Sequence, residues 1–294
     1  MINISTLLQQ MLNGISFGIL MALLATGLSL IFGMLGIINF AHGSLYMLAA
    51  YFVWTFSNLF NIPGRFWLGL IITLPTMAIV GFIIEKGLFR KMYDKPPVYQ
   101  LLITFGILLV IQQGVALIYG TMPLHLEVPG FLSGEINLGL FHYPSYRFFA
   151  ALLGMFIVLG VWLLIERSYL GAIIRACAED PETARTLGIS TTAVFTWTYV
   201  LGTVLAGLGG GLHAPMVPSL QHTMGMEILL INFIVVVIGG MGSIRGALLG
   251  GVILGMVRAI ASVLWAPASD FVMFVAMGII LIVRPQGLLG KGGA

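Results

Sequence analysis

The sequence predicts an all-α protein, a polytopic transmembrane helical bundle of about nine spans with broken helices. The first observation is composition, because 59% of the 294 residues are hydrophobic and 8% are charged, against about 25% charged residues in a typical soluble domain. The second is pattern, because apolar runs of roughly 20 residues, enough for one span, recur along the chain. Residues 1–294 therefore form a single transmembrane domain.

Several functional classes are excluded by what the sequence lacks. The formal net charge is +3 and no Lys/Arg cluster is interleaved with aromatic residues, so nucleic-acid binding is not indicated. Cys177 is the single cysteine, which excludes an internal disulfide, and no Cys/His grouping has zinc spacing. The phosphate loop GxxxxGKS/T and HExxH are absent, and His42 as a catalytic base would lack a nucleophile. We therefore predict a non-catalytic protein with no metal site and no cofactor.

Five apolar runs fill the first part of the chain. The opening stretch MINISTLLQQ lacks the basic flank of a signal peptide, so the first run is expected to be a retained span. Gly14 and Gly18 within it have the GxxxG spacing that lets a second helix approach closely. The five runs lie at residues 7–35, 45–60, 66–84, 99–119 and 148–165.

A polar but uncharged stretch, residues 36–44, separates the first two runs. It contains Asn39, His42, Gly43 and Ser44, which makes it too polar for a lipid-facing span and too uncharged for an ordinary loop. One interpretation is backbone that interrupts a helix at membrane depth while packed inside protein. The other is a tight turn just outside the bilayer, with His42 on the surface.

Positive charge sets the expected orientation. Residues 85–97 (EKGLFRKMYDKPP) form the most basic connection, and cytoplasmic loops carry an excess of Lys and Arg. The loop 120–146 has neither Lys nor Arg, which places it outside. Since the N-terminal segment is uncharged and Lys291 lies near the other end, we predict an N-terminus outside and a C-terminus in the cytoplasm.

The densest charge lies at residues 166–189, which hold seven charged residues and fall on the cytoplasmic side by alternation. Two short helices are expected here, the first ending near Glu179 because Pro181 disfavours helical backbone at the preceding residue. Asp180 then caps a second helix of about two turns, with Pro181 at its first position. Gly188 follows the last turn, where glycine is common.

This second helix has Ala184 and Leu187 on one face, three residues apart. Either this small apolar face fits the groove of a partner protein, or the segment is an ordinary solvated loop helix. A membrane protein with no energy source of its own is a channel, a carrier or one part of a larger machine. The charged segment favours the last, because it offers a docking site for an energising subunit.

The remaining runs follow this segment. An outer loop at 213–227 follows the next span, and a short run at 228–238 is expected to continue into the glycine-rich residues 239–251. The complete spans are predicted at 192–212, 247–265 and 270–284.

Arg258 lies within one of these predicted spans. A charge inside a span is costly and usually faces a cavity or a partner. A long arginine side chain can instead snorkel toward the membrane surface. Both interpretations stay open for this residue.

Interrupted helices at 36–44 and 239–251 fall one in each half of the chain. Paired broken helices of this kind point to a translocation path near the midplane of the membrane. The alternative is glycine-rich packing with no role in a pore. The candidate path residues are Asn39, His42, Gly43, Ser44, Gly239, Gly240, Gly242 and Ser243.

Four segments, taken in order, resemble one known family. They are INFAHGSLYMLAAY (38–51), LGAIIRACAEDPETARTLGI (170–189), LINFIVVVIGGMGSIRGALLGG (230–251) and IVRPQGLLG (282–290). Together they resemble the permease family of bacterial branched-chain amino-acid ABC transporters, and most closely the first subunit of the permease pair. Members often carry an acidic residue near the position of Arg258, so the resemblance transfers no role to it.

The resemblance implies partners and a cellular place. Such a permease pairs with a second, similar permease subunit as a heterodimer in the bacterial inner membrane, with two cytoplasmic ATPase subunits and a periplasmic substrate-binding protein. It implies that the segment 171–188 docks on an ATPase and that the loops 120–146 and 213–227 meet the binding protein. The coupling residues it implies are Gly171, Arg175, Ala176, Asp180, Pro181, Ala184, Arg185 and Gly188.

The predicted function is ATP-driven import of branched-chain, or related small neutral, amino acids by alternating access. ATP hydrolysis falls to the partner subunits, and the segment 166–189 is the cytoplasmic coupling element that moves the spans beside it. The rival is an ATPase-independent channel or facilitator for a small neutral solute such as urea or an amide. The rival predicts uptake by the purified protein alone.

Overall fold

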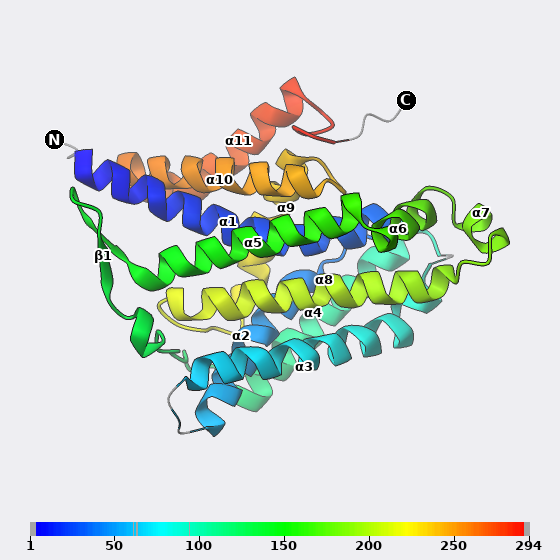
Figure 1. The fold of residues 1–294 in the computed structure, drawn as a ribbon, viewed down its shortest axis with the longest axis horizontal. Coiled ribbons are helices and arrows are strands. Elements are labelled where there is room, and N and C mark those ends of the chain that lie inside the picture. The colour runs from blue at the N-terminus through cyan, green and yellow to red at the C-terminus, as the bar shows by residue number, and fades with distance from the viewer. Residues whose placement is uncertain (1–3, 61, 63, 94, 291–294) are drawn as a thin grey trace.

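The computed structural model describes residues 4–60, 62, 64–93 and 95–290, so that Lys291 lies outside the described residues. The described chain forms a bundle of helices with a small two-stranded sheet at one end (Figure 1). The helices are α1 (Ile4–Leu35), α2 (Ala41–Leu59), α3 (Arg65–Gly87), α4 (Pro97–Tyr119), α5 (Ser145–Arg167), α6 (Tyr169–Glu179), α7 (Pro181–Thr186), α8 (Thr191–His213), α9 (Met224–Gly239), α10 (Ile244–Trp265) and α11 (Ser269–Val283).

A helical bundle of the membrane type is confirmed, because each predicted apolar run corresponds to one helix in the described part of the chain. The expected continuation of the run at 228–238 into residues 239–251 is wrong, because α9 ends at Gly239. Six stretches there are long and apolar enough to cross a membrane, and the last of them contains both α10 and α11. The helix α9 has 16 residues and reaches ~24 Å, less than the ~30 Å of a bilayer core. The six stretches are Ile4–Leu35, Arg65–Lys91, Pro97–Tyr119, Ser145–Arg167, Thr191–Met216 and Ile244–Val283.

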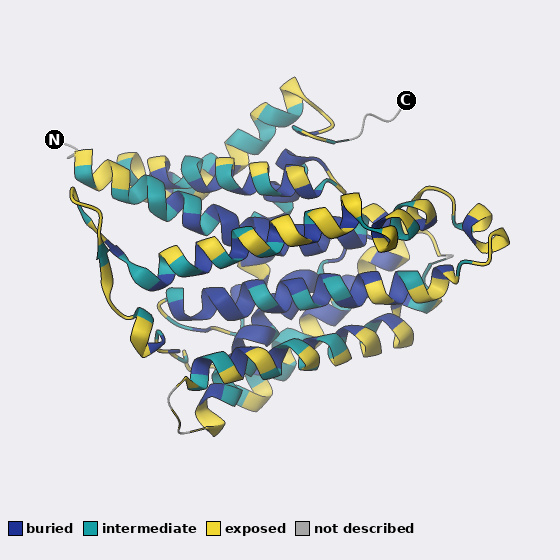
Figure 2. Ribbon diagram, viewed as in Figure 1, coloured by how far each residue is buried: buried dark blue, intermediate teal, exposed yellow. Residues whose placement is uncertain are grey.

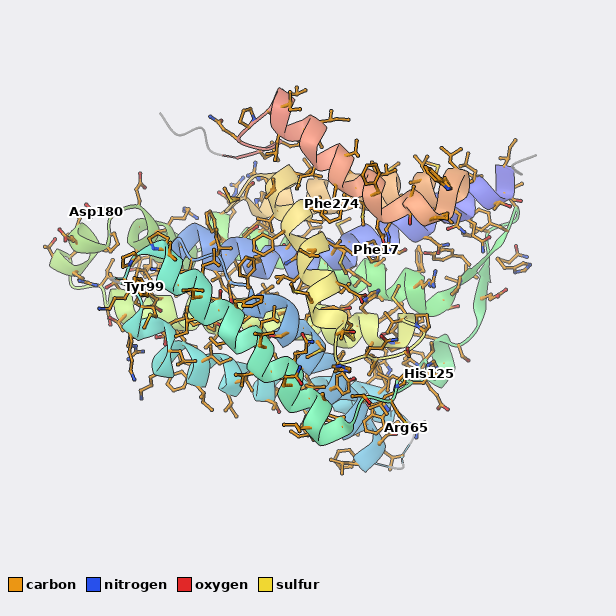
Figure 3. All side chains as sticks on the ribbon, turned by 180° about the vertical axis from the view of Figure 1, so that it is seen from behind. Phe17, Arg65, Tyr99, His125, Asp180 and Phe274 are labelled. Atoms are coloured by element: carbon orange, nitrogen blue, oxygen red, sulfur yellow. The ribbon has the colours of Figure 1, made fainter. Side chains whose placement is uncertain are left out.

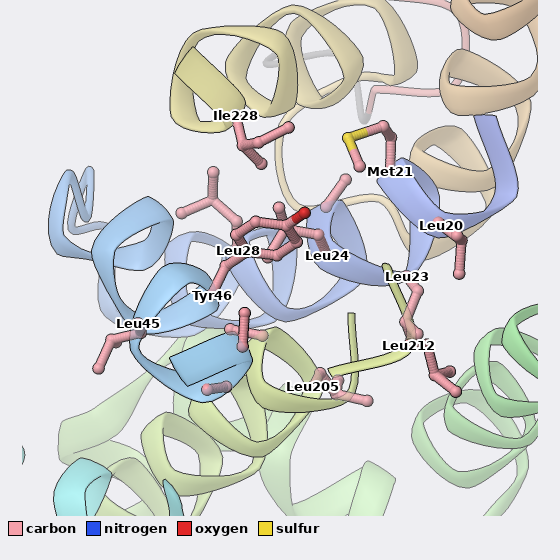
Figure 4. Packing of buried hydrophobic residues seen from close by; sticks show 14 of the residues in the cluster. Leu20, Met21, Leu23, Leu24, Leu28, Leu45, Tyr46, Leu205, Leu212 and Ile228 are labelled. Carbon is pink, nitrogen blue, oxygen red and sulfur yellow. The ribbon is translucent and has the colours of Figure 1, made fainter. Parts of the chain in front are cut away.

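The helix α1 lies at the centre of the bundle. Every residue from 18 to 31 is buried, and α1 packs against α5, α8, α9 and α10. Leu24 and Leu28 belong to the same core cluster as Tyr46 of α2 and Ile228 of α9 (Figure 4). Exposed apolar residues instead gather on outer helices such as α3, α4 and α5, where lipid would cover them (Figure 2). A helix that is apolar on all sides is therefore enclosed by the others.

Glycines bring α1 and α10 into very close contact. Gly14 of α1 faces Gly255 of α10, and Gly18 faces Gly251. A Cβ added to any of these four glycines would meet the backbone of the opposite helix. The predicted use of the GxxxG spacing is confirmed, and the second helix supplies the same spacing.

The first interruption follows α1 and covers residues 36–40. Gly36 has a φ of +66°, in the left-handed region that favours glycine. The predicted break, which extended to Ser44, is too long because α2 already begins at Ala41. His42 is 0% exposed, so the alternative that placed it on the surface is wrong, and Ile37 and Asn39 within the break are buried as well.

The second interruption joins α9 to α10. Only residues 240–243 leave the helix, with φ values of +99° at Gly240 and +80° at Gly242. The predicted break at 239–251 is too long, because the Ser243 hydroxyl caps α10 by accepting a backbone N–H at 3.0 Å. Backbone hydrogen bonds also join the segment after α11 to the last turn of α9.

The two predicted outer loops lie at the end of the bundle away from α6 and α7 (Figure 1). Leu124 and Leu220 exchange backbone hydrogen bonds of 3.1 and 2.7 Å, which tie the loops together. The all-α prediction missed β1 (Glu135–Asn137) and β2 (His142–Pro144), which pair antiparallel. Strands of three residues are too short to show an alternating apolar pattern.

Replacing Gly251 by alanine tests the contact between α1 and α10. The added Cβ meets the backbone of Gly18, and we expect a loss on the order of 1–3 kcal/mol in the free energy of unfolding. Thermal unfolding of the purified protein in detergent measures this loss. Gly278→Ala on α11 is the matched control, because a Cβ there meets open space, and equal midpoints for the two variants would contradict the contact.

Candidate functional site

The helices α6 and α7 form a compact unit at one end of the bundle (Figure 1). The predicted helix ends are confirmed, because α6 stops at Glu179 and Asp180 caps α7. The Asp180 carboxylate accepts the N–H groups of Glu182 at 3.1 Å and Thr183 at 3.0 Å. Hydrogen bonds from the Thr183 hydroxyl and then its N–H lower the pKa of Asp180 below its ordinary value. Gly188 ends the unit with a φ of +82°.

Two of the predicted coupling residues hold α6 against the end of α5. Gly171 lies where α6 passes Leu164 and Ile165, and a Cβ there would meet their carbonyl groups. The Arg175 guanidinium donates a hydrogen bond to the Ile165 carbonyl. Both residues therefore act inside the chain, where they set the angle between α5 and α6.

A buried apolar cluster joins the unit to the bundle. It contains Met34 of α1, Cys177 of α6, Ala184 of α7 and Phe195 of α8. Ala184 is 3% exposed whereas Leu187 is 75% exposed. The predicted shared outward face of these two residues is wrong, because Ala184 packs inward and anchors α7 to α1 and α8. We call these four residues the anchor cluster.

The other predicted coupling residues are accessible from outside. The Arg185 guanidinium is exposed, and its Nε donates to the Thr191 hydroxyl on α8 at 2.8 Å. That bond fixes the position of a charge at the tip of the unit. The half-buried members are Arg175 and Pro181, and the exposed members are Ala176, Asp180, Arg185 and Gly188.

A buried ion pair at the same end joins the connection after α3 to α8. Glu85 is 0% exposed, lies 3.3 Å from Arg90 and accepts the Tyr93 hydroxyl at 2.6 Å. Arg90 also donates to the Thr196 hydroxyl of α8 at 2.8 Å. Burial, followed by the Glu85 carboxylate, raises the pKa of Tyr93, which stays a donor. Sequence analysis missed these four residues, the α3–α8 clamp, because it used the basic connection only to assign a membrane side.

Polar groups at the first interruption are bonded within the chain. His42 Nε2 donates to the Leu24 carbonyl of α1 at 3.0 Å. The Asn39 side chain accepts the N–H of Ala41 at 3.1 Å, and the Ser44 hydroxyl donates to the Ala41 carbonyl at 2.8 Å. The Asn39 bond gives a partner to one of the backbone N–H groups that the start of α2 leaves without a helical acceptor.

Two buried polar side chains in this region keep unused hydrogen-bonding atoms. His42 Nδ1 and both amide atoms of Asn232 on α9 have no hydrogen-bond partner among the described residues. Gly43 of α2 meanwhile lies against Gly225 of α9, where a Cβ would meet backbone. The first turn of α2 therefore packs directly against α9.

The second interruption contacts α1 near the C-terminal end of that helix. Gly242 lies against Gly33 of α1, so the structure brings both interruptions to the same central helix. Of the predicted path residues at this break, Gly239 and Gly240 are buried, Gly242 is exposed and Ser243 is half-buried.

A cavity of about 610 Å³ lies between α1, α2, α9, α10 and α11. Its volume falls within the ~300–1,000 Å³ typical of small-molecule sites. Phe17 of α1 and Phe274 of α11 both line it, and Figure 3 shows them from behind. Tyr46 and His213, hydrogen-bonded to each other, line it as well. None of the eight predicted path residues lines it, although Tyr46 follows Gly43 by less than one turn of α2.

Arg258 lines this cavity, as the first of its two interpretations expects. Its Nε lies 3.2 Å from an oxygen of Asp270, and its guanidinium carbon lies 4.6 Å from the centre of the Phe17 ring. Sequence analysis missed Asp270 as its partner, because the two lie on different helices. Glu227 on the first turn of α9 also lines the cavity.

These features define a class, a multi-pass α-helical membrane protein with a polar cavity in its bundle and a compact charged unit at one end. Within the described ranges no group of acidic, His and Cys side chains could hold a metal ion. The chain belongs to the family described as branched-chain amino acid transport system / permease component, whose family model matches residues 10–283.

Individual relatives agree with this assignment. The chain is 32% identical over 300 residues to the high-affinity branched-chain amino acid transport system permease protein LivH of Salmonella typhimurium, with 97% of this chain and 96% of LivH covered. It is 29% identical to BraD, a permease protein of the same description from Pseudomonas aeruginosa, at the same coverage. It is 26% identical to LivM of Salmonella typhimurium, with 91% of this chain and 67% of LivM covered. No solved structure matches the chain.

Asp180→Ala tests the cap of α7. Without the acceptor we expect faster amide hydrogen exchange across residues 181–187, with the α6 amides as an internal reference. Asp180→Asn retains a good N-cap and should keep exchange slow. The pKa of Asp180 in the folded protein lies below its ordinary value of 3.8. The ionised cap therefore stabilises the fold above that pH, and this stabilisation is lost as the pH falls through the lowered pKa. Wild-type exchange in the alanine variant would contradict the cap.

The α3–α8 clamp makes a second prediction. Arg90→Gln leaves the buried Glu85 carboxylate without its cation, which we expect to destabilise the fold by on the order of 3 kcal/mol. Adding Glu85→Gln removes the unpaired charge and should restore much of the loss. Thermal unfolding of the single and double variants in detergent measures their loss of stability. If the loss in the double variant were the sum of the two single losses, the ion pair between Glu85 and Arg90 would be contradicted.

Proposed function

We propose that the chain is the permease subunit of an ATP-driven importer that carries branched-chain, or related small neutral, amino acids into the cell. Family membership and the similarity to LivH and BraD, which are branched-chain amino acid permease proteins, support the solute class. The observation that carries the proposal is the anchor cluster, which fixes an exposed, charged helix unit to α1 and α8. A unit built in this way suits the transfer of motion from a protein docked on its outside.

The proposed assembly has a second permease subunit, two cytoplasmic ATPase subunits that hydrolyse ATP and a periplasmic substrate-binding protein. Similarity to both LivH and LivM supports a pair of unlike permeases. In a bacterial inner membrane, with the N-terminus outside and the C-terminus in the cytoplasm, α6 and α7 face the ATPases. The loops 120–146 and 213–227 then face the binding protein.

The proposed mechanism is alternating access driven through α7. When the ATPases close, displacement of α7 moves Ala184, which packs on Met34 and Phe195. Motion therefore passes to α1 and α8 together, because the packed cluster cannot be compressed.

The predicted path residues remain part of this proposal. Buried polar atoms without partners are costly inside a membrane, and His42 Nδ1 on α2 and Asn232 on α9 supply such atoms. A second conformation, or a polar solute in transit, would give them partners. The path proposed on this ground runs along Asn39, His42, Gly43 and Ser44 toward Gly239, Gly240, Gly242 and Ser243.

The stand-alone channel is the weaker alternative. The relatives reported above are all named as permease proteins of transport systems. A channel would also give no reason for the anchoring of an exposed charged unit to the central helix.

Arg185→Glu tests docking of an ATPase at the tip of the unit. In proteoliposomes that contain the complete importer, we expect ATP-driven leucine uptake to fall by on the order of tenfold or more, as when a charge at a protein interface is reversed. Lys86→Glu is the matched control, since it reverses an exposed charge on the same side of the bundle but outside α6 and α7. Uptake by the Arg185 variant equal to that of the control would rule out docking there.

A further inference from the structure

We propose that the cavity lined by Arg258 and Glu227 is a transit site for a zwitterionic amino acid with an aliphatic side chain. Arg258 would bind the α-carboxylate, Glu227 the α-ammonium group, and the apolar wall the side chain. The inference rests on the proposed function and adds the binding site and the recognition chemistry. It concerns a cavity that neither interruption of the helices lines.

The first argument is that Arg258 keeps unused donors toward the cavity. Its Nε pairs with Asp270 at 3.2 Å, and its guanidinium stacks on Phe17. No hydrogen bond among the described residues uses its two terminal nitrogens, which form an edge that binds a carboxylate in two parallel bonds. A charge within a membrane helix is costly, and its default explanation is function.

The second argument is that Glu227 has no cationic partner among the described residues. It lies in the first turn of α9, where an acidic side chain also complements the helix dipole. The helix dipole would favour an acidic side chain on any face of this first turn. Glu227, however, lines the same cavity as Arg258. An ammonium group in the cavity would give this carboxylate an opposite charge.

The third argument is the wall between these charges. Met224, Ile228 and Met273 are at least nine-tenths buried and line the cavity. Methionine and isoleucine side chains give a surface that suits branched aliphatic groups and adapts to their shape. The about 610 Å³ volume leaves room for such a solute.

Together the charges favour a zwitterion over a simple ion. An anion would meet Arg258 but also the carboxylates of Asp270 and Glu227. A cation would meet Glu227 and Asp270 but also the guanidinium of Arg258. A molecule that carries both charges can place each one against its opposite.

The experiment measures ligand preference at the cavity itself. The permease pair with its ATPases is purified without the binding protein, and competition against radiolabelled leucine is measured for three ligands. These are leucine, its keto acid 4-methyl-2-oxopentanoate, which lacks the ammonium group, and 3-methylbutylamine, which lacks the carboxylate. The wild-type complex should prefer leucine to both analogues.

Each substitution should remove one preference. Glu227→Gln should reduce the preference for leucine over the keto acid, and Arg258→Gln the preference over the amine, each by on the order of ten- to a hundredfold. Glu227→Asp should restore part of the first preference. Arg245→Gln is the matched control, since Arg245 lies on the same helix but stacks on Trp162 away from the cavity, and its preferences should equal the wild-type values.

The outcomes separate this inference from the proposed function. If the complete importer takes up leucine with ATP but both variants keep the wild-type preferences, the transit site is wrong and the importer stands. Wild-type binding that does not favour leucine over the amine also overturns the site. Absence of ATP-driven uptake of any branched-chain amino acid overturns the proposed function instead. If Arg258→Gln fails to assemble, the Glu227→Gln result decides, because Glu227 is exposed at the cavity.

Discussion

The close contact between α1 and α10 is the constraint on which the rest of the structure depends. Gly14 and Gly18 allow the backbones of the two helices to touch at Gly255 and Gly251. Side chains next to these glycines are brought together as a consequence, and Phe17 of α1 thus lies under Arg258 of α10. A larger residue at the crossing would separate the ring from the guanidinium and widen the cavity between them. The packing of small residues and the chemistry of the cavity therefore have one cause.

The central helix α1 also connects the cavity to the anchor cluster, the two regions that the proposed function uses. Phe17 lines the cavity and Met34 belongs to the anchor cluster, and 17 residues of helix separate them by ~25 Å. Between these positions every residue from 18 to 31 is buried, so α1 cannot bend without disturbing the whole core. A displacement at α7 would therefore reach the cavity as a shift of α1, because the intervening packing leaves no space to absorb it.

The sequence was sufficient for the features that rest on local chemistry. The cap at Asp180, the end of the α6–α7 unit at Gly188 and the GxxxG spacing in α1 follow from residue type and spacing alone. Contacts between distant segments were not accessible, because spacing along a chain does not show which faces meet. The partner of Arg258 on α11 and the inward face of Ala184 are both of this kind. Both breaks were predicted too long, since glycine that packs a helix and glycine that ends one look the same in a sequence.

The two interruptions place α9 in a special position among the helices. It begins at the cavity with Met224 and Glu227 and ends at Gly240, where positive φ lets the chain turn. The α3–α8 clamp and the anchor cluster hold α3, α6, α7 and α8 in place. The helix α9 instead carries Asn232, whose buried amide has no partner among the described residues. The unpaired amide makes the present position of α9 less stable. A rotation of the helix that gave this amide a hydrogen-bond partner would lower the free energy. In alternating access, the glycine break would then serve as the hinge about which α9 opens and closes the cavity, while the contact of α1 with α10 stays intact.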